Sequence, residues 1–389
     1  MRKGWEYKKL GEVCEVVTGT TPKTNIPEYW GKGHYWVTPA ELNDTTVYID
    51  KTERQITDEA LSKTKLRLLP VGTVLLSSRA PIGKVAIANA EMYCNQEFKN
   101  CICSEAINNK YLFYFLRLKK DYLNSLGRGA TFKEISKSIV ESIKIPLPPK
   151  STQLAIVSEL DKINELIRLK KEQLKDFDNL AQSLFYEMFG DPVENEKGWE
   201  VKKLNDICDV RDGTHDSPKY LQNSEYILIT SKNIVNGSID FENVNYISEE
   251  DYIKINKRSK VDNGDIIMPM IGTIGNPIIA HIDGTHKFCI KNVALIKFLA
   301  DSTVNNMFIV NLMRCSSFSS YLLNQNKGGT QKFVALGAIR KLPIPLPPLS
   351  LQRLFAQRIE QIEREKSEVQ KSIQDLETLL ASRMQYWFE

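Results

Sequence analysis

The sequence predicts an α+β fold in which two pseudo-symmetric, mostly β domains are separated by a long antiparallel two-helix coiled coil. Three observations lead to this fold class. The chain repeats itself at an offset of about 194 residues, the pentapeptide IPLPP occurs twice, and each copy precedes a charged stretch with heptad spacing. We expect the first β domain at 1–149, the first helix at 150–190, the second β domain at 191–348 and the second helix at 349–389.

The repeat is clearest at the start of each copy. GWEYKKLGEVCEVVTGTTPK from Gly4 is echoed by GWEVKKLNDICDVRDGTHDSPK from Gly198, and WVTPAEL at Trp36 corresponds to LITSKNI at Leu228. Two repeats of this length indicate two domains rather than a solenoid, which stacks many short units.

Further matches continue along both copies. RAPIGKVAI at Arg79 corresponds to MIGTIGNPII at Met270, and GRGATFK at Gly127 corresponds to NKGGTQK at Asn326, where the offset has grown to 199. The growing offset indicates a tandem duplication with insertions in loops.

Each repeat begins with a β-rich part. Short runs such as GTVLLSS, GKVAIA, YILIT and GDIIMPMI are rich in aliphatic and β-branched residues and are bounded by Gly, Pro and Asn. A helical pattern spans roughly Lys110 to Leu126. Each repeat therefore predicts a small, mostly β domain with some helix.

After each IPLPP, apolar residues recur at alternating intervals of four and three, which is the coiled-coil spacing. Polar residues interrupt the pattern at Lys170, Lys366 and Arg383. Helices of about 35 residues would be roughly 50 Å long at 1.5 Å per residue. The predicted seam comprises Ile156, Leu160, Ile163, Ile167, Leu174, Phe177 and Leu184 in the first helix, and Phe355, Ile359, Ile362, Val369, Ile373, Leu376 and Leu380 in the second.

The apolar stripe of each helix must be buried against another apolar surface. The stripe of the other helix in the same chain is the nearest candidate. The second β domain carries the chain from the end of the first helix to the start of the second, which favours an antiparallel pair. Proline fixes φ and disfavours helix before it, so IPLPP reads as a stiff connector. We expect Ser151 and Ser350, followed by Gln153 and Gln352, at the helix N-caps.

Composition and charge restrict the class of protein. With 42% hydrophobic residues, no long apolar run and no apolar core in MRKGWEYKKL, the chain is expected to be globular and cytoplasmic. Seven scattered cysteines fit buried free thiols better than a disulfide framework or a zinc site. The net charge is +4, and the excess lies in residues 1–149, which carry 22 Lys and Arg against 16 Asp and Glu.

Common catalytic motifs are absent from the sequence. Gly83-Lys84 lacks the glycine spacing of a P-loop, and no H-E-x-x-H occurs among four histidines. A Pro-Asp dipeptide typical of restriction nucleases is missing, and Asn276-Pro277 lacks the second proline and aromatic of an N6-adenine methyltransferase signature. The sequence therefore favours a binding protein over an enzyme.

The doubled order of motifs carries a family resemblance. Two β-rich domains, each opened by G-W-x-x-K-K-L and closed by I-P-L-P-P-x-S-x-Q before a heptad helix, resemble the specificity subunit of type I restriction-modification systems over essentially the whole chain. The resemblance implies a non-catalytic subunit with two target recognition domains, each reading one half of a split, asymmetric DNA site. The helix pair would set the gap between the halves.

The resemblance also implies partners and cofactors. Two methyltransferase subunits that use S-adenosylmethionine would dock on the helices, and two ATP-driven restriction subunits would complete the assembly on double-stranded DNA. The chain itself would bind no cofactor and no metal, while S-adenosylmethionine, ATP and magnesium would belong to the partner subunits. No membrane is expected among its partners.

Candidate DNA contacts are polar or basic residues in Gly- and Pro-rich loops, because such side chains reach phosphates and base edges. For each residue taken separately, a solvated loop or turn residue is the alternative interpretation. The first domain offers Thr20, Lys23, Asn25, Arg79, Lys84, Asn95, Gln96, Arg128 and Lys133, and the second offers Thr214, His215, Lys219, Lys232, Asn233, Asn292, Lys327 and Lys332.

Two other functions stay open from sequence. The chain could be a structural adaptor that assembles a multi-subunit complex without reading DNA, or an enzyme whose site escapes motif search. Salt-dependent binding to duplex DNA in the presence of a methyltransferase partner separates DNA reading from a purely structural role, because phosphate contacts release counterions. Methylation by the chain alone would indicate an enzyme.

Overall fold

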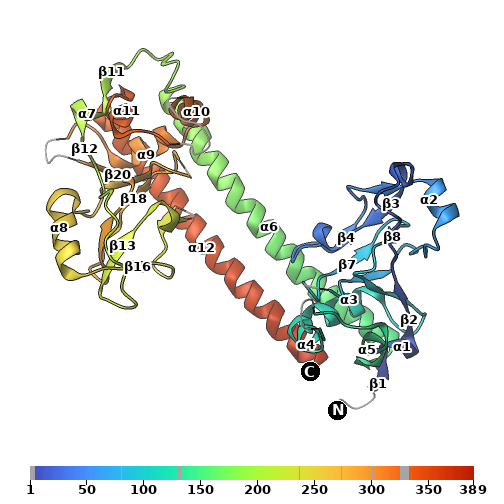
Figure 1. The fold of residues 1–389 in the computed structure, drawn as a ribbon. Coiled ribbons are helices and arrows are strands. Elements are labelled where there is room, and N and C mark those ends of the chain that lie inside the picture. Colours follow the sequence, from blue (N-terminus) through green and yellow to red (C-terminus); the bar gives the residue numbers. More distant parts are fainter. Residues whose placement is uncertain are drawn as a thin grey trace. The chain divides into compact units, whose positions relative to one another are not determined.

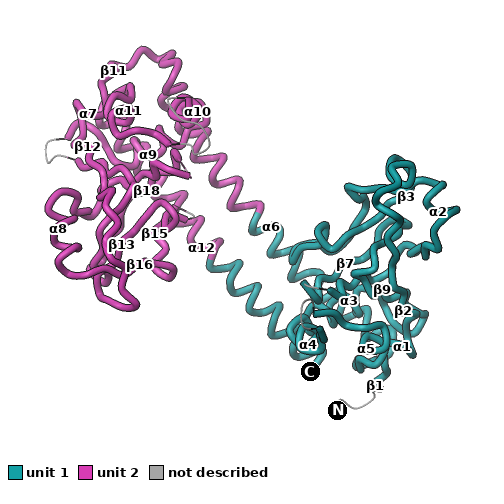
Figure 2. Tube along the Cα trace, in the orientation of Figure 1, with its two compact units in different colours: residues 1–171, 371–389 teal, residues 172–370 magenta. Residues whose placement is uncertain are grey.

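The structure is a computed structural model that describes residues 5–79, 81–129, 133–235, 237–272, 274–298, 302–324 and 333–389 (Figure 1). It divides into two compact units, which Figure 2 shows in two colours: unit 1 comprises residues 1–171 with 371–389, and unit 2 comprises residues 172–370. Each unit therefore holds one β domain together with part of each long helix. The domain boundaries inferred from sequence stay a prediction.

Unit 1 contains a five-stranded sheet in the order β2-β9-β6-β7-β4 and a three-stranded sheet in the order β5-β3-β8. The strands pair mainly antiparallel, but β3 pairs parallel with β8 and β4 parallel with β7. The elements are β1 (Glu6–Lys9), α1 (Leu10–Val13), β2 (Cys14–Thr18), β3 (Trp30–Val37), β4 (Tyr48–Ile49), β5 (Gln55–Ile56), α2 (Asp58–Lys63), β6 (Val74–Leu76), β7 (Val85–Ala88), β8 (Tyr93–Cys94), β9 (Lys99–Cys103), α3 (Asn109–Leu118), α4 (Lys120–Ser125), α5 (Lys137–Ser142) and β10 (Lys144–Leu147).

Unit 2 repeats this plan with a four-stranded sheet, β12-β20-β17-β18, and a three-stranded sheet, β16-β13-β19, in which β13 and β19 are parallel. Its elements are β11 (Glu200–Lys203), α7 (Leu204–Ile207), β12 (Asp209–Asp212), β13 (Tyr226–Ile229), β14 (Ile234–Val235), β15 (Ser238–Ile239), β16 (Asn245–Tyr246), α8 (Glu249–Ser259), β17 (Ile266–Pro269), β18 (Ile278–Ile279), β19 (Lys287–Ile290), β20 (Val293–Lys297), α9 (Asn306–Arg314), α10 (Ser316–Asn324), α11 (Leu336–Arg340) and β21 (Pro343–Leu346).

The repeated pentapeptide closes each β domain. In unit 1, β10 contains the first residues of IPLPP and pairs antiparallel with β1, so that Ile145 lies opposite Lys8. In unit 2, β21 pairs in the same way with β11, and Ile344 lies opposite Lys202. Proline is tolerated because these are isolated two-stranded ribbons with open edges. The opening and closing motifs of each repeat are therefore partners in one ribbon.

Two 40-residue helices follow the pentapeptides: α6 (Lys150–Phe189) and α12 (Leu349–Phe388). Within unit 1 they run antiparallel, since Glu159 bonds Arg383 while Lys171 bonds Glu377 at 2.7 Å. In unit 2, Lys366 reaches Asp178 at 2.8 Å, so this seam lysine gains a carboxylate partner on the facing helix. The helices are slightly longer than the sequence predicted.

The predicted seam residues lie on the side of each helix that is turned away from solvent. In the first helix Ile156, Leu160, Ile163 and Ile167 are buried, as are Phe355, Ile359, Ile362, Val369 and Ile373 in the second. The remaining predicted positions are half-buried, namely Leu174, Phe177, Leu184, Leu376 and Leu380. Both ends of the pair merge into a domain core: Met384 and Phe388 join that of unit 1, and Phe355 joins that of unit 2.

The prediction that Ser151 and Ser350 lie at the helix N-caps is wrong. The helices begin at Lys150 and Leu349, so Ser151 and Ser350 lie inside the first turn. The glutamines matter instead: buried Gln153 accepts from Asn108 N at 2.8 Å and donates to the carbonyls of Ala106 and Pro148, both at 3.0 Å. Gln352 makes the same set of bonds in unit 2. Each glutamine ties the connector to the domain.

Within the described part of the chain, every helix is too short or too polar to cross a bilayer.

Candidate nucleic-acid interface

A tight glycine turn ends the strand β2 in unit 1. A Cβ on Gly19 would lie 2.1 Å from the carbonyl oxygen of Asn95, so only glycine fits there. The next residue, Thr20, donates its backbone N–H to Cys94 O at 2.9 Å, and the Thr21 hydroxyl bonds the side-chain oxygen of Gln96. Two loops that are 75 residues apart in sequence therefore meet.

Unit 2 builds the same turn with different side chains. A Cβ on Gly213 would lie 2.4 Å from Ile290 O, and Thr214 N donates to that carbonyl at 3.0 Å. His215 Nδ1 lies 3.0 Å from Asn292 Oδ1. Thr20 and Gln96 thus correspond to Thr214 and Asn292. Thr21, which the sequence argument missed, corresponds to His215 and could have been found by aligning the two Gly-Thr pairs.

A second group of loops meets around Glu134 in unit 1. Its carboxylate lies 3.1 Å from Lys99 Nζ and 3.8 Å from Arg79 Nε. The backbones of Glu134 and Arg128 exchange two hydrogen bonds of 3.0 Å. This pairing brings the predicted residues Arg79 and Arg128 together and leaves Lys133 exposed beside them. A compact basic edge results, and basic edges of this kind attract phosphates.

Three predicted contacts are occupied within the protein. Buried Asn95 bonds the backbone and side chain of Glu97, and buried Asn233 donates to the carbonyls of Asp240 and Asn243. Lys84 Nζ donates to Pro39 O at 2.9 Å. These internal hydrogen bonds stabilise the loops. Sequence composition alone does not show whether such a polar side chain bonds within the protein or is available to DNA.

Of the other predicted DNA contacts, some are exposed and some lie outside the described residues. Lys23, Asn25, Lys219 and Lys232 are exposed on loops or a short 3₁₀ turn. Lys327 and Lys332 lie outside the described residues.

Electrostatics distinguish His215 from the other candidates. Its pKa is raised above its ordinary value of 6.5 by hydrogen bonds to Asn292 and Asp212, the latter at 2.8 Å. Asp212 is buried and also bonds Arg258, so its charge has little access to water. The second domain therefore holds an imidazole with a raised pKa at the position where the first domain has a threonine.

We expect a pH-dependent contribution of His215 to stability. Because the folded chain raises this pKa, the stabilisation is complete below about pH 6.5 and is lost as pH rises through the folded value. The free energy of unfolding of wild type minus that of His215→Gln should shrink between pH 5.5 and 8.5, as measured by urea denaturation. The side chain is 58% exposed, so the change should stay below about 1 kcal/mol. An equal difference at both pH values would contradict the expectation.

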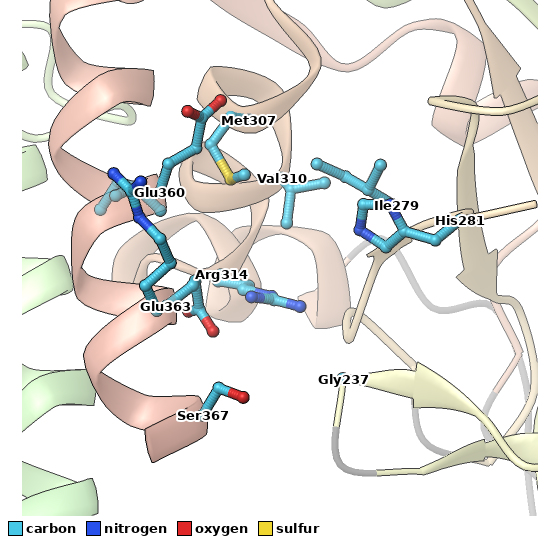
Figure 3. A pocket seen from close by; sticks show the side chains of 11 residues that line it. Gly237, Ile279, His281, Met307, Val310, Arg314, Glu360, Glu363 and Ser367 are labelled. Atoms are coloured by element: carbon cyan, nitrogen blue, oxygen red, sulfur yellow. The ribbon is translucent and has the colours of Figure 1, made fainter. Parts of the chain in front are cut away.

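A pocket of about 490 Å³ also lies in unit 2 (Figure 3). Glu360 and Glu363 from α12 and Arg314 from α9 line it together with apolar Met307 and Val310. Its lining contains none of the sequence-predicted DNA contacts that the structure describes. The pocket is therefore distinct from the Gly-Thr turn and its neighbouring loops.

Comparison with solved structures shows which known fold the chain shares. The fold matches a structure described as the structural basis of complex assembly and conformational transition of the type I restriction-modification system, with a TM-score of 0.64, 18% identity and coverage of 99% of this chain and 97% of that one. It also matches a type I restriction-modification S subunit from M. genitalium, with a TM-score of 0.54, 14% identity and coverage of 99% and 96%. This chain thus shares the fold of both solved structures.

Sequence comparison shows the family. The model of the type I restriction modification DNA specificity domain matches residues 2–176 and 196–378, so the chain belongs to this family. The MjaIX specificity subunit of Methanocaldococcus jannaschii is 32% identical over 380 residues, covering 91% of this chain and 85% of the relative. The EcoR124I/EcoR124II specificity subunit of Escherichia coli is 32% identical over 168 residues, covering 41% of each chain. The resemblance drawn from the doubled motifs is confirmed.

Proposed function

We propose that this chain is the non-catalytic specificity subunit of a type I restriction-modification complex and that each β domain reads one half of a bipartite DNA site. The single observation that carries this proposal is the duplicated turn. Gly19-Thr20 and Gly213-Thr214 present one backbone frame, and different side chains follow in each copy, Thr21 with Gln96 and His215 with Asn292. Two domains with the same backbone turn but different polar side chains are suited to recognising different DNA sequences.

The helices α6 and α12 fix the spacing of the two half-sites in this proposal and contribute to docking of two methyltransferase subunits, with two restriction subunits completing the complex. Within each unit, a facing ion pair and buried apolar residues hold the two helices together, and α12 enters the domain core of that unit, which supports a spacing role. S-adenosylmethionine, ATP and magnesium act on the partner subunits.

Mapping of methylated adenines in a host that carries the complete operon tests the proposal. The expected result is one split motif with a gap of constant length, which disappears when the gene for this chain is deleted. Methylation that persists in the deletion strain, or a continuous motif, would overturn the proposal. If the purified complex binds DNA without the salt dependence of phosphate contacts, the structural-adaptor alternative is favoured.

Lengthening both helices by two turns is expected to lengthen the gap. Seven extra heptad-compatible residues after Leu174 and after Gln370 add about 10 Å to each helix, which corresponds to roughly three base pairs at 3.4 Å each. Both points lie in unit 2, each about one helical turn from a member of the Lys366–Asp178 pair. Methylation mapping should then show unchanged half-sites and a gap about three base pairs longer.

The same insertion in α6 alone serves as the control. It shifts one apolar stripe past the other without adding equal length, so methylation should be lost rather than redirected. An unchanged gap in the double insertion would contradict a spacing role for the helices.

A further inference from the structure

In the first domain, Arg54 stacks on an indole ring. The guanidinium carbon of Arg54 is 3.9 Å from the ring centre of Trp30 and 5.3 Å from that of Trp36. The two indoles meet edge to face at 4.8 Å, and Trp36 is buried. A planar guanidinium on an indole face gains cation–π attraction and loses much of its rotational freedom. Arg54 is exposed, and its guanidinium lies against the face of the Trp30 indole.

The same indoles hold the loop that contains three candidate DNA contacts. Trp30 Nε1 donates to Lys23 O at 3.3 Å, and Trp36 Nε1 donates to Thr20 O at 3.4 Å. The loop and the arginine are consequently anchored to one aromatic pair. One indole, that of Trp30, thus contacts both the Arg54 guanidinium and the backbone of the loop at Lys23.

The backbone of Arg54 is fixed as well. Its carbonyl accepts from Trp36 N at 3.2 Å and from the Thr52 hydroxyl at 2.6 Å. Among the described residues, no carboxylate lies within ion-pair distance of its guanidinium. Arg67 in the same domain differs, because its guanidinium donates to both oxygens of Glu15 at 3.0 and 3.1 Å. Unlike Arg67, Arg54 therefore forms no ion pair with a carboxylate of the described residues.

We propose that Arg54 is a DNA-contacting residue of the first domain, oriented by Trp30 and Trp36. The proposal rests on the proposed DNA-reading function. A fixed guanidinium edge binds a pair of acceptors, which DNA offers as guanine O6 and N7 or as two phosphate oxygens. Arg54 lies outside any Gly- or Pro-rich loop, so loop composition does not single it out as a DNA contact.

The second domain has a different pair of residues at the positions that correspond to Trp36 and Arg54. Trp36 corresponds to Leu228 in the second copy, and the residue paired with Leu228 on β16 is Asn245. Neither residue can form a cation–π stack. The contact should therefore affect only one half of a bipartite site.

The test uses the complex with its methyltransferase subunits and a duplex that carries the sequence mapped in the host. Arg54→Lys keeps the charge and loses the planar fork, and Arg67→Lys is the matched control. We expect Arg54→Lys to weaken binding about 10- to 100-fold and Arg67→Lys to leave it unchanged. Dissociation constants are measured at several salt concentrations and on duplexes changed one base pair at a time.

The two acceptor sources give different results. A relaxed preference at one position of the first half-site assigns Arg54 to a guanine edge, whereas an equal loss on every duplex assigns it to a phosphate. Equal affinity of Arg54→Lys and wild type would overturn the inference even if the melting temperature fell. Failure of the wild-type complex to bind the mapped duplex would instead overturn the proposed function.

A second variant addresses the loop itself. Trp30→Phe keeps an aromatic face for Arg54 and removes the N–H bond to Lys23 O. We expect its methylation pattern to change in the first half-site only. A pattern altered in both halves would mean that the tryptophan acts on general stability and not on the orientation of this loop.

Discussion

Exchanging residues 1–149 for the first domain of another specificity subunit is expected to change one half of the methylated sequence and to leave the other half and the gap unchanged. The β1–β10 ribbon closes this domain immediately before α6, so the junction after Pro149 keeps each ribbon intact. Methylation mapping provides the measurement. A change in both halves would contradict independent reading by the two domains.

The structure adds a condition to this exchange. The ring of Phe388 at the end of α12 lies 5.0 Å from that of Tyr111 and 5.8 Å from that of Phe115, inside the core of unit 1. A donor domain must supply large apolar side chains at those two positions, because a cavity there would loosen the helix end. The matched control exchanges residues 191–348, which should alter the other half-site only.

Replacing Phe355 with alanine is expected to destabilise unit 2 by about 3–5 kcal/mol, since it empties a fully buried aromatic site. Its ring contacts Phe185 and Phe189 of α6 at 5.6 and 5.2 Å between centres, and Phe308 of α9 completes this four-ring cluster. Hydrogen exchange of amides in unit 2 measures the loss. The neighbouring residue on the same helix turn, Leu354, is 43% exposed and provides the control substitution to alanine.

Leu354→Ala should cost less than about 1 kcal/mol, because most of its side chain already faces water. Similar losses in the two variants would contradict the assignment of Phe355 to the joint between helix pair and domain.

Much of the fold could be predicted because it is written in periodic or repeated patterns. Heptad spacing placed the buried side of both helices, and the helical pattern near Lys110 corresponds to α3 and α4. The identical pentapeptides located both joints. Boundaries were less accurate: the serines expected at the N-caps lie one position inside helices that begin at Lys150 and Leu349.

The candidate site could be predicted only in part, because loop composition does not state which hydrogen bonds a side chain makes. Asn95, Asn233 and Lys84 have the right chemistry for DNA, but the fold engages their polar atoms internally. Arg54 has the same chemistry and is oriented by two tryptophans that are 24 and 18 residues away in sequence. Such long-range partners become visible only in three dimensions.

The sequence by itself determined that this protein has two copies of one β domain, two heptad helices and a family shared with type I specificity subunits, because repeats and periodicity are properties of residue order. Only the tertiary structure decided which polar side chains are available. It brought Thr21 to Gln96 and His215 to Asn292, and it stacked Arg54 on Trp30. The physical reason is that availability depends on the partners and burial that chain folding imposes, and these partners lie far apart along the chain.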